Sequence, residues 1–187
     1  MIIGALADLV SKTMIFNQHF DLTLSENHQR QHVTWLIDGV LGIQTSTNPG
    51  ALFGMGSGYS WLFAIFSVVA LAGIVIWLFV FKAAVDRWLT FALGLVAGGI
   101  IGNCYDRLGF GAGPGYPEQI RDNVRDWIYF RLEGVPWFDP WPNFNIADSL
   151  LVVGAFMLFV HSFVLYKNEV KEERTVDVTP ESSTQAP

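Results

Sequence analysis

Residues 60–81 read SWLFAIFSVVALAGIVIWLFVF and contain no charged side chain. An α-helix rises about 1.5 Å per residue, so a helix of this length crosses the roughly 30 Å hydrocarbon core of a bilayer. The segment therefore predicts a membrane-spanning helix. Residues 88–104 and 150–166 are nearly as apolar, and they extend the prediction to a bundle of such helices.

The composition of the whole chain is also that of a membrane protein. Of its 187 residues, 51% are hydrophobic, 14% aromatic and only 15% charged. The net charge is -6, but five of the 17 acidic residues lie within residues 169–187. The remainder is close to balanced, and nothing indicates a nucleic-acid partner. The lone cysteine, Cys104, excludes an intrachain disulfide framework and a cysteine-rich metal site.

The segments before and after these three helices complete the predicted architecture. The first apolar segment, residues 1–16, carries Asp8 and Lys12 and is short for a full span. This favours a true start upstream of Met1 over a tilted first helix. Alternating apolar and polar residues between positions 32 and 43 predict strands outside the bilayer.

The fold class expected from this pattern is an all-α membrane protein with four transmembrane helices. It would include a small extracytoplasmic β-containing module at residues 17–59. A short amphipathic periplasmic helix is expected around residues 117–132, within an extracytoplasmic loop at 106–146. The membrane domain would cover residues 1–168, with its last helix at about 147–166. Residues 169–187, rich in Thr, Ser, Pro, Glu and Gln, are expected to form a disordered cytoplasmic tail.

The distribution of basic residues predicts the orientation of the helices. The short connector 82–87 contains Lys82 and Arg87, whereas residues 17–59 contain only Arg30. By the positive-inside rule this connector is cytoplasmic, and four spans then place both termini on the cytoplasmic side. The opposite helix ends would face the outside.

Acidic side chains collect near these outer helix ends and in the loop between the third and fourth helices. They include Asp8, Asp106, Asp126 and Asp148. Charges at a membrane edge are costly, which favours a functional interpretation. Two carboxylates that share one water cannot both ionise cheaply, so such a pair holds one proton and can hydrolyse a peptide bond. The structural alternative is that Asp106 and Arg107 form an ion pair and that Asp148 caps a helix.

Other reactive side chains receive structural interpretations. His28 and His32 have a metal-binding helical spacing but no third ligand nearby, so a solvent-facing pair is predicted. Cys104 lacks a neighbouring histidine base, which makes it a poor nucleophile. His161 lies in the middle of the fourth apolar segment and is predicted to form a helix–helix hydrogen bond.

Two long motifs bring in a family resemblance. Residues 98–107, GGIIGNCYDR, resemble the GGxxGNxxDR signature of the lipoprotein signal peptidases (signal peptidase II), and residues 144–149, FNIADS, resemble the FNxADS signature. Residues 48–54, NPGALFG, are similar to the NxGAAFG box, and residues 8–12, DLVSK, to the DxxTK box. The resemblance covers residues 8 to about 160.

The resemblance implies a function and a catalytic pair. It implies an aspartic endopeptidase that removes signal peptides from prolipoproteins, before a diacylglyceryl-modified cysteine, and that is inhibited by globomycin. Asp148 matches the catalytic aspartate of FNxADS, and Asp126, in VRDWI, matches that of a V-x-D-F-I stretch. An insert at 109–123 leaves Asp122 and Asp106 as alternatives to Asp126.

The resemblance also implies supporting residues, partners and a location. The expected enzyme needs no metal or organic cofactor and is a monomer in the bacterial inner membrane. It acts at the extracytoplasmic face on lipid-modified prolipoproteins, in contact with membrane lipid. A non-enzymatic membrane scaffold and an intramembrane aspartyl protease with deeper acids remain as rival hypotheses. The supporting or substrate-binding residues would be Asn48, Gly50, Asn103, Asp106, Arg107, Asn145, Ala147, Asp8 and Lys12.

Overall fold

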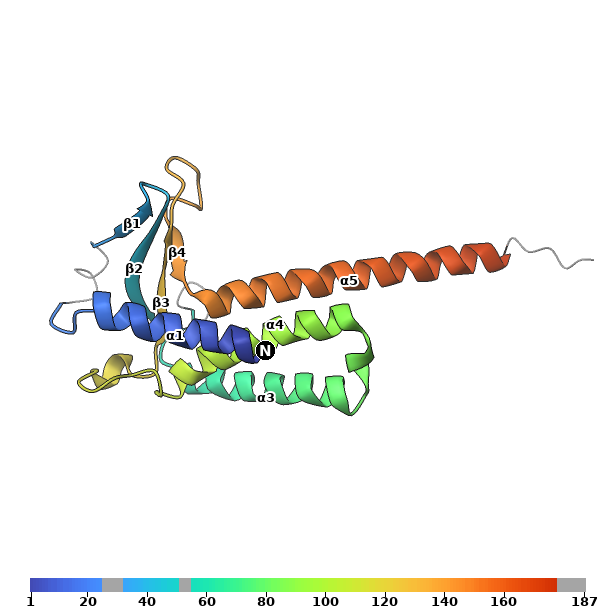
Figure 1. Cartoon of the computed structure of the whole chain (residues 1–187), viewed down its shortest axis with the longest axis horizontal. Helices are drawn as coiled ribbons and strands as arrows, with labels where there is room; N and C mark the ends of the chain where they lie inside the picture. Colours follow the sequence, from blue (N-terminus) through green and yellow to red (C-terminus); the bar gives the residue numbers. More distant parts are fainter. Residues whose placement is uncertain (25–31, 51–54, 178–187) are drawn as a thin grey trace, which may run out of the picture.

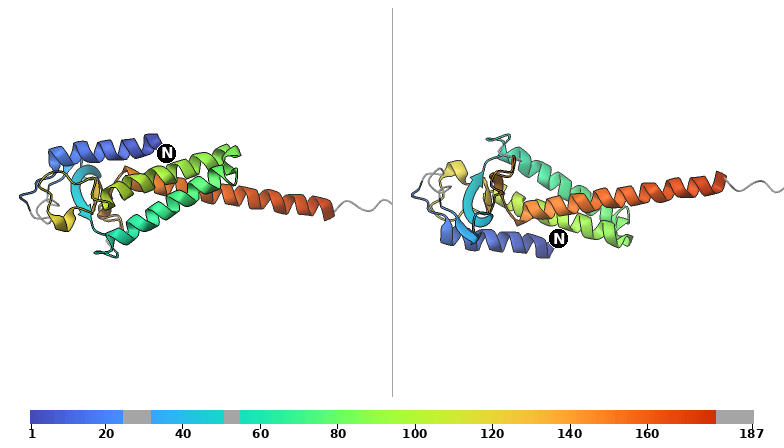
Figure 2. Two further views of the ribbon diagram at one scale, coloured as in Figure 1. Left: turned by 90° about the horizontal axis from the view of Figure 1, so that it is seen from below. Right: turned by 90° about the horizontal axis from the view of Figure 1, so that it is seen from above.

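Long helices lie alongside one another, and a small sheet sits at one end of them (Figures 1 and 2). The computed structural model describes residues 1–24, 32–50 and 55–177. Within these residues α4 is the central helix, because it contacts each of the other three. The four long helices are α1 (Ile2–His19), α3 (Ser60–Phe79), α4 (Arg87–Arg107) and α5 (Ile146–Asp177).

Three helices in the described part of the chain are long and apolar enough to cross a membrane. They are α3, α4 and the Ile146–Val164 part of α5. The fourth predicted span, α1, is 18 residues long but is not among them. It ends in the polar residues 17–19 and carries Asp8 and Lys12, whose side chains are fully buried against the rest of the protein.

Small residues allow α4 to approach its neighbours closely. A Cβ atom at Gly99 would lie 2.5 Å from the main-chain oxygen of Ala147, and one at Gly102 would collide with the carboxylate of Asp8. Close contact through glycine and alanine is a common way for helices to associate in membranes. The glycines of the GGxxGN stretch therefore bring α1 and α5 against the same face of α4.

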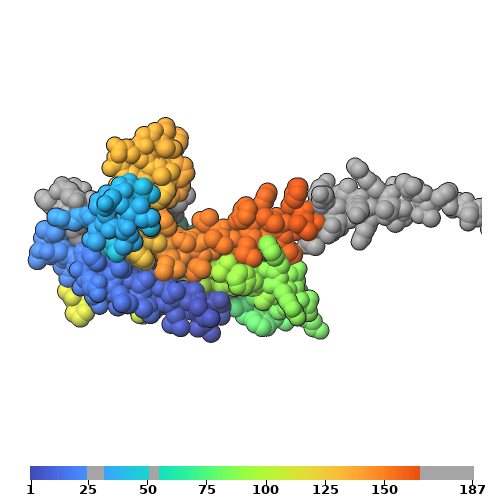
Figure 3. All heavy atoms as spheres, turned by 45° about the horizontal axis from the view of Figure 1, so that its top comes forward, coloured from blue at the N-terminus to red at the C-terminus, as the bar shows by residue number. Residues whose placement is uncertain are grey.

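The sheet is antiparallel and has the strand order β1-β2-β3-β4. The predicted strands between positions 32 and 43 are confirmed as β1 and the start of β2, which a turn at Gly39 (φ 72°) connects. In the space-filling view the β3–β4 hairpin stands out from the body of the molecule (Figure 3). The strands are β1 (Thr34–Ile37), β2 (Leu41–Asn48), β3 (Val124–Phe130) and β4 (Trp141–Phe144).

The predicted amphipathic helix at 117–132 is wrong. Only one short 3-10 turn, η3 (Glu118–Ile120), forms there, and the following residues make β3. The sequence VRDWIYF is rich in residues that favour strands, and β2 provides an edge with which they pair, for example Ser46 opposite Asp126. The expected all-α class is corrected accordingly, to a helical membrane protein that carries a four-stranded antiparallel sheet.

Helix α5 runs further than the sequence predicted. It ends at Asp177 instead of near Tyr166, so it continues into the segment expected to be disordered from residue 169. The rest of the predicted tail, residues 178–187, lies outside the described residues.

Contacts at the far end of the bundle join α5 to the start of α4. Asp86 caps α4 by accepting a 2.9 Å hydrogen bond from the Leu89 amide. Its other carboxylate oxygen lies 2.6 Å from Nε2 of His161 on α5. The predicted helix–helix hydrogen bond of His161 is therefore confirmed.

Candidate active site

Asp126 and Asp148 approach each other where α5 begins beside the sheet. Asp126 lies in the middle of β3, and Asp148 lies in the first turn of α5. Asn145 is bonded to both carboxylates: its side-chain Nδ2 donates to Asp126 Oδ1 at 2.7 Å, and its main-chain N–H donates to Asp148 Oδ2 at 3.1 Å. Asp126 is 2% exposed, whereas Asp148 is only half-buried.

Helix α4 adds a second amide to this arrangement. Asn103 donates from Nδ2 to Asp148 Oδ1 at 2.8 Å. Its Oδ1 atom accepts a 3.1 Å hydrogen bond from Asn145 Nδ2. The two asparagines therefore connect three elements, α4, β3 and α5, and hold both carboxylates in place.

The environment of Asp126 favours its protonated form. Burial and the charge of Asp148 raise the pKa of Asp126 well above its ordinary value of 3.8. Lys12 and hydrogen bonds from Asn145 and Asn48 act in the opposite direction but do not outweigh them. A carboxyl group that keeps its proton beside a second carboxylate is the arrangement that paired acid–base catalysis requires.

Asp148 also has a structural role: it caps α5, as the structural interpretation of the sequence predicted. Its main-chain N–H donates to Asn145 Oδ1 at 2.9 Å, while its carboxylate accepts the Asn145 main-chain N–H. This is a reciprocal capping box at the start of α5, and a carboxylate suits the positive end of a helix. Capping fixes the direction of the Asp148 carboxylate, so the two roles are compatible.

A buried ion network lies behind the pair. Lys12 Nζ is 2.7 Å from Asp8 Oδ2 and 3.0 Å from Asp106 Oδ2. Asp106 Oδ1 is in turn 2.8 Å from Nη2 of Arg125, which precedes Asp126 on β3. All four side chains are at most 5% exposed. The network contains two anions and two cations, so its formal charges balance.

Asp106 and Asp122 occupy different places from the Asp126–Asp148 pair. Asp106 accepts hydrogen bonds from the Arg125 main-chain N–H at 3.1 Å and from Arg125 Nε at 2.9 Å. It therefore pairs with Lys12 and Arg125, not with the adjacent Arg107. Asp122 precedes β3, and its main-chain oxygen accepts the Ser60 hydroxyl at 2.6 Å.

The insert at 109–123 packs onto the Asp106–Arg125 ion pair. A Cβ atom at Gly111 would collide with Asp106 Oδ1 and would lie 2.9 Å from the Arg125 guanidinium carbon. Sequence reasoning missed Arg125 as a site residue. The available signal was a cation in an otherwise apolar strand, directly beside a predicted catalytic aspartate.

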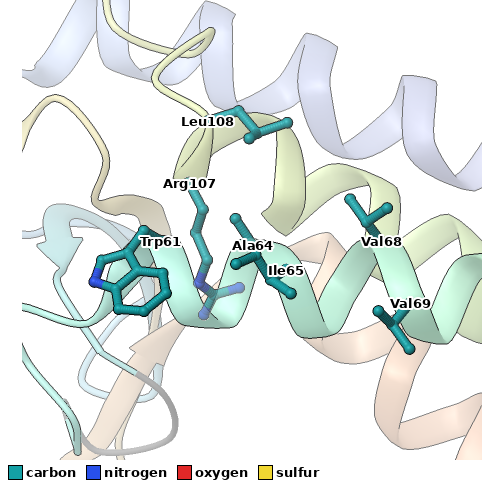
Figure 4. A pocket seen from close by; sticks show the side chains of 7 residues that line it. All are labelled: Trp61, Ala64, Ile65, Val68, Val69, Arg107 and Leu108. Carbon is teal, nitrogen blue, oxygen red and sulfur yellow. The ribbon is translucent and has the colours of Figure 1, made fainter.

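Arg107 extends from the end of α4 across α3 (Figure 4). Its Nη2 donates to the Gly50 main-chain oxygen at 3.2 Å, and its guanidinium lies 5.4 Å from the centroid of the Phe63 ring. Its charge also acts on Asp148 and Asp126. It borders a groove of about 500 Å³ whose other lining residues are Trp61, Ala64, Ile65, Val68, Val69 and Leu108.

The remaining predicted site residues support the pair from nearby. Asn48 Oδ1 accepts the Gly50 N–H at 3.0 Å, which shapes the turn that receives Arg107. Ala147 is fully buried, and its N–H donates to Asp8 Oδ1 at 2.8 Å. In the described part of the chain, no group of three or more His, Cys, Asp or Glu side chains could hold a metal ion.

The fold and site define a multi-pass membrane protein with two neighbouring carboxyl groups, one buried and one half-buried, at one end of its helices. The chain belongs to the signal peptidase II family: the family model described as Signal peptidase (SPase) II matches residues 1–164.

Relatives named lipoprotein signal peptidase match most of the chain. The protein of Rhodopirellula baltica is 58% identical over 133 residues, which cover 71% of this chain and 58% of that relative. The protein of Geobacillus thermodenitrificans is 39% identical over 128 residues, which cover 68% of this chain and 70% of the relative. The chain thus spans somewhat more than half the length of the first relative and about two thirds of the second.

Two solved structures of bacterial membrane enzymes, both obtained by the in meso method, have a similar fold. One, at 2.3 Å resolution, has a TM-score of 0.67 and 24% identity, with 98% of this chain and 91% of that chain covered. The other, at 1.9 Å resolution, has a TM-score of 0.62 and 25% identity, with 86% and 87% covered.

Proposed function

We propose that this protein is an aspartic endopeptidase that removes signal peptides from prolipoproteins, with Asp126 and Asp148 as its catalytic pair. The observation that carries the proposal is the attachment of both carboxyl groups to Asn145, at 2.7 and 3.1 Å, together with the raised pKa of Asp126. The names of the relatives supply the substrate class.

The catalytic cycle follows from the unequal surroundings of the two carboxyl groups. Asp126, with its raised pKa, holds the shared proton and donates a hydrogen bond to the scissile carbonyl. Asp148, which is more accessible, takes a proton from the attacking water. The tetrahedral intermediate then collapses as the leaving amine receives a proton from the pair. Neither a metal nor an organic cofactor takes part.

The supporting residues divide into three groups in this proposal. Asn103, Asn145 and Asn48 hold the pair directly, while Asp8, Lys12, Asp106 and Ala147 brace it from behind. Arg107 and Gly50 border the side from which the substrate enters. The protein acts as a monomer at the extracytoplasmic face of the bacterial inner membrane, with both termini in the cytoplasm.

The groove beside Arg107 is the proposed place for one acyl chain of the substrate. Cleavage before a diacylglyceryl-modified cysteine puts lipid within one residue of the scissile bond. The groove begins at Arg107, whose charge acts on both aspartates, and continues along the apolar face of the membrane-spanning helix α3. The guanidinium can donate hydrogen bonds to ester oxygens while the chain lies against Val68 and Val69.

The function is tested with the purified full chain in lipid vesicles and a prolipoprotein peptide carrying diacylglycerol on its cysteine. We expect cleavage on the amino side of that cysteine, inhibition by globomycin and no cleavage of the same peptide without lipid. Equal cleavage of both peptides would contradict the proposed substrate class. An inactive protein under all conditions would favour a non-enzymatic membrane scaffold.

The acyl-chain site makes a separate prediction. Val68→Trp fills the groove and should raise KM for a dipalmitoyl substrate about tenfold, because displacing two methylene contacts costs about 1.6 kcal/mol. A dihexanoyl substrate should be affected less. Ile76→Trp is the matched control, since Ile76 is also exposed on α3 but does not line the groove. Equal KM values for the two variants would place the acyl chain elsewhere.

A further inference from the structure

Lys12 is a fully buried cation whose ammonium group contacts three acceptors. Its Nζ atom lies 2.7 Å from Asp8 Oδ2, 3.0 Å from Asp106 Oδ2 and 2.9 Å from Asn103 Oδ1. The contact with Asn103 is a hydrogen bond, and the two contacts with the carboxylates are ion pairs. Together they fix the ammonium group between α1 and α4.

The contact with Asn103 sets the direction of that amide. An amide presents an oxygen acceptor on one side and two N–H donors on the other. Lys12 Nζ and Asn145 Nδ2 both donate to Asn103 Oδ1, at 2.9 and 3.1 Å. A reversed amide would place its NH₂ group against these two donors. Asn103 Nδ2 is consequently directed to Asp148 Oδ1, at 2.8 Å.

The charge of Lys12 also reaches the catalytic pair. The charged side chains that act on Asp126 include Asp148, Lys12 from α1 and Arg107 from α4. A nearby cation favours the ionised form of a carboxyl group, and burial strengthens the interaction. Lys12 therefore opposes the burial and the anionic neighbour that keep Asp126 protonated.

We propose that Lys12 is a positioning residue of this site, which orients the Asn103 amide toward Asp148 and whose positive charge acts on the carboxyl group of Asp126. The proposal rests on the catalytic pair assigned above. It assigns to Lys12 a task that packing alone does not require, because a buried apolar side chain of similar length would fill the same space.

The test removes the cation without leaving a net charge in the network. Lys12→Met alone would leave Asp8 and Asp106 with one cation between them, so it is combined with Asp8→Asn. The reference is Asp8→Asn alone, from which the double variant differs only at Lys12. A second double variant, Asp8→Asn with Lys12→Gln, restores an N–H donor to Asn103 without the charge. Circular dichroism and thermal unfolding confirm that each variant is folded.

Relative to Asp8→Asn, the Lys12→Met double variant should lose roughly ten- to a hundredfold in kcat, because the Asn103 amide is no longer fixed. Its alkaline limb should move up by about one pH unit, because Asp126, the proposed acid, keeps its proton to a higher pH without the cation. The Lys12→Gln double variant should show the same pH shift with a smaller loss of kcat. Superimposable pH profiles for all three proteins would overturn the proposal.

An infrared pH titration separates this inference from the proposed function. The band of the protonated carboxyl group is identified by its loss in Asp126→Asn. The pH at which half of this band disappears, its midpoint, is measured without substrate. The midpoint should rise in both double variants relative to Asp8→Asn. A protein that cleaves no lipidated peptide but shows this rise would refute the peptidase proposal and leave the role of Lys12 intact. Active protein with an unchanged midpoint would refute the role of Lys12.

Discussion

Asp126→Asn and Asp148→Asn each lower kcat for a lipidated prolipoprotein peptide by at least about a thousandfold, while the protein remains folded and inserted. Acid–base catalysis by a positioned side chain contributes about 10²- to 10⁴-fold, and both members of the pair transfer protons in the same step. An asparagine keeps the shape and one acceptor oxygen of the carboxyl group but cannot transfer the proton. Single-turnover cleavage in vesicles measures the effect.

Asp126→Asn should also change how the stability of the protein depends on pH. The pKa of Asp126 is higher in the folded protein than its ordinary value of 3.8, so the folded state binds the proton more readily than the unfolded state. Stability contributed by this group is therefore lost as the pH rises from about 3.8 to the raised value. Asp126→Asn should remove this part of the pH dependence of unfolding and should not destabilise the protein at pH 7.

Asp38→Asn is the control for both substitutions, because Asp38 is exposed in the turn between β1 and β2. It should leave kcat and the unfolding temperature unchanged. If either Asp126→Asn or Asp148→Asn cleaved at a rate near that of the wild type, the catalytic pair would be wrongly assigned.

The sequence predicted best those features whose cause is local. A long charge-free segment predicts a spanning helix from its own composition, and all three such segments form helices of sufficient length. Likewise, Asn145 and Asp148 are three residues apart, so their reciprocal hydrogen bonds need only the first turn of α5. Here both sequence interpretations of Asp148, as a helix cap and as a candidate catalytic aspartate, apply to the same side chain.

Features that depend on distant residues were predicted poorly. Strand β3 forms because β2, some 80 residues earlier, offers a pairing edge, and nothing in residues 117–132 alone indicates that partner. The structural alternative paired Asp106 with the adjacent Arg107, but its ion partners are Lys12 and Arg125, the latter 19 residues further along the chain. Adjacent residues on a helix point in different directions, which is why the sequence neighbour does not make the pair.

Asp106→Ala destabilises the protein by about 3 to 5 kcal/mol, since it leaves the buried cations Lys12 and Arg125 with only Asp8 as counterion. Denaturant unfolding in detergent micelles measures the change. Activity should fall as well, because Asp106 holds the main chain of Arg125, next to Asp126, through a 3.1 Å hydrogen bond. The remaining folded enzyme should keep the pH profile of the wild type, since the catalytic carboxyl groups are retained.

A variant that restores the charge balance of the buried ion network distinguishes a structural role of Asp106 from a catalytic one. The double variant Asp106→Asn with Arg125→Met removes one anion and one cation, so it should recover much of the stability that Asp106→Ala loses. Measurable peptide cleavage should return with it. A double variant as stable as the wild type but without activity, alongside an active Asp126→Asn, would transfer the catalytic role to Asp106. The full burial of Asp106 between two cations argues against that outcome, because Lys12 and Arg125 already occupy both of its carboxylate oxygens.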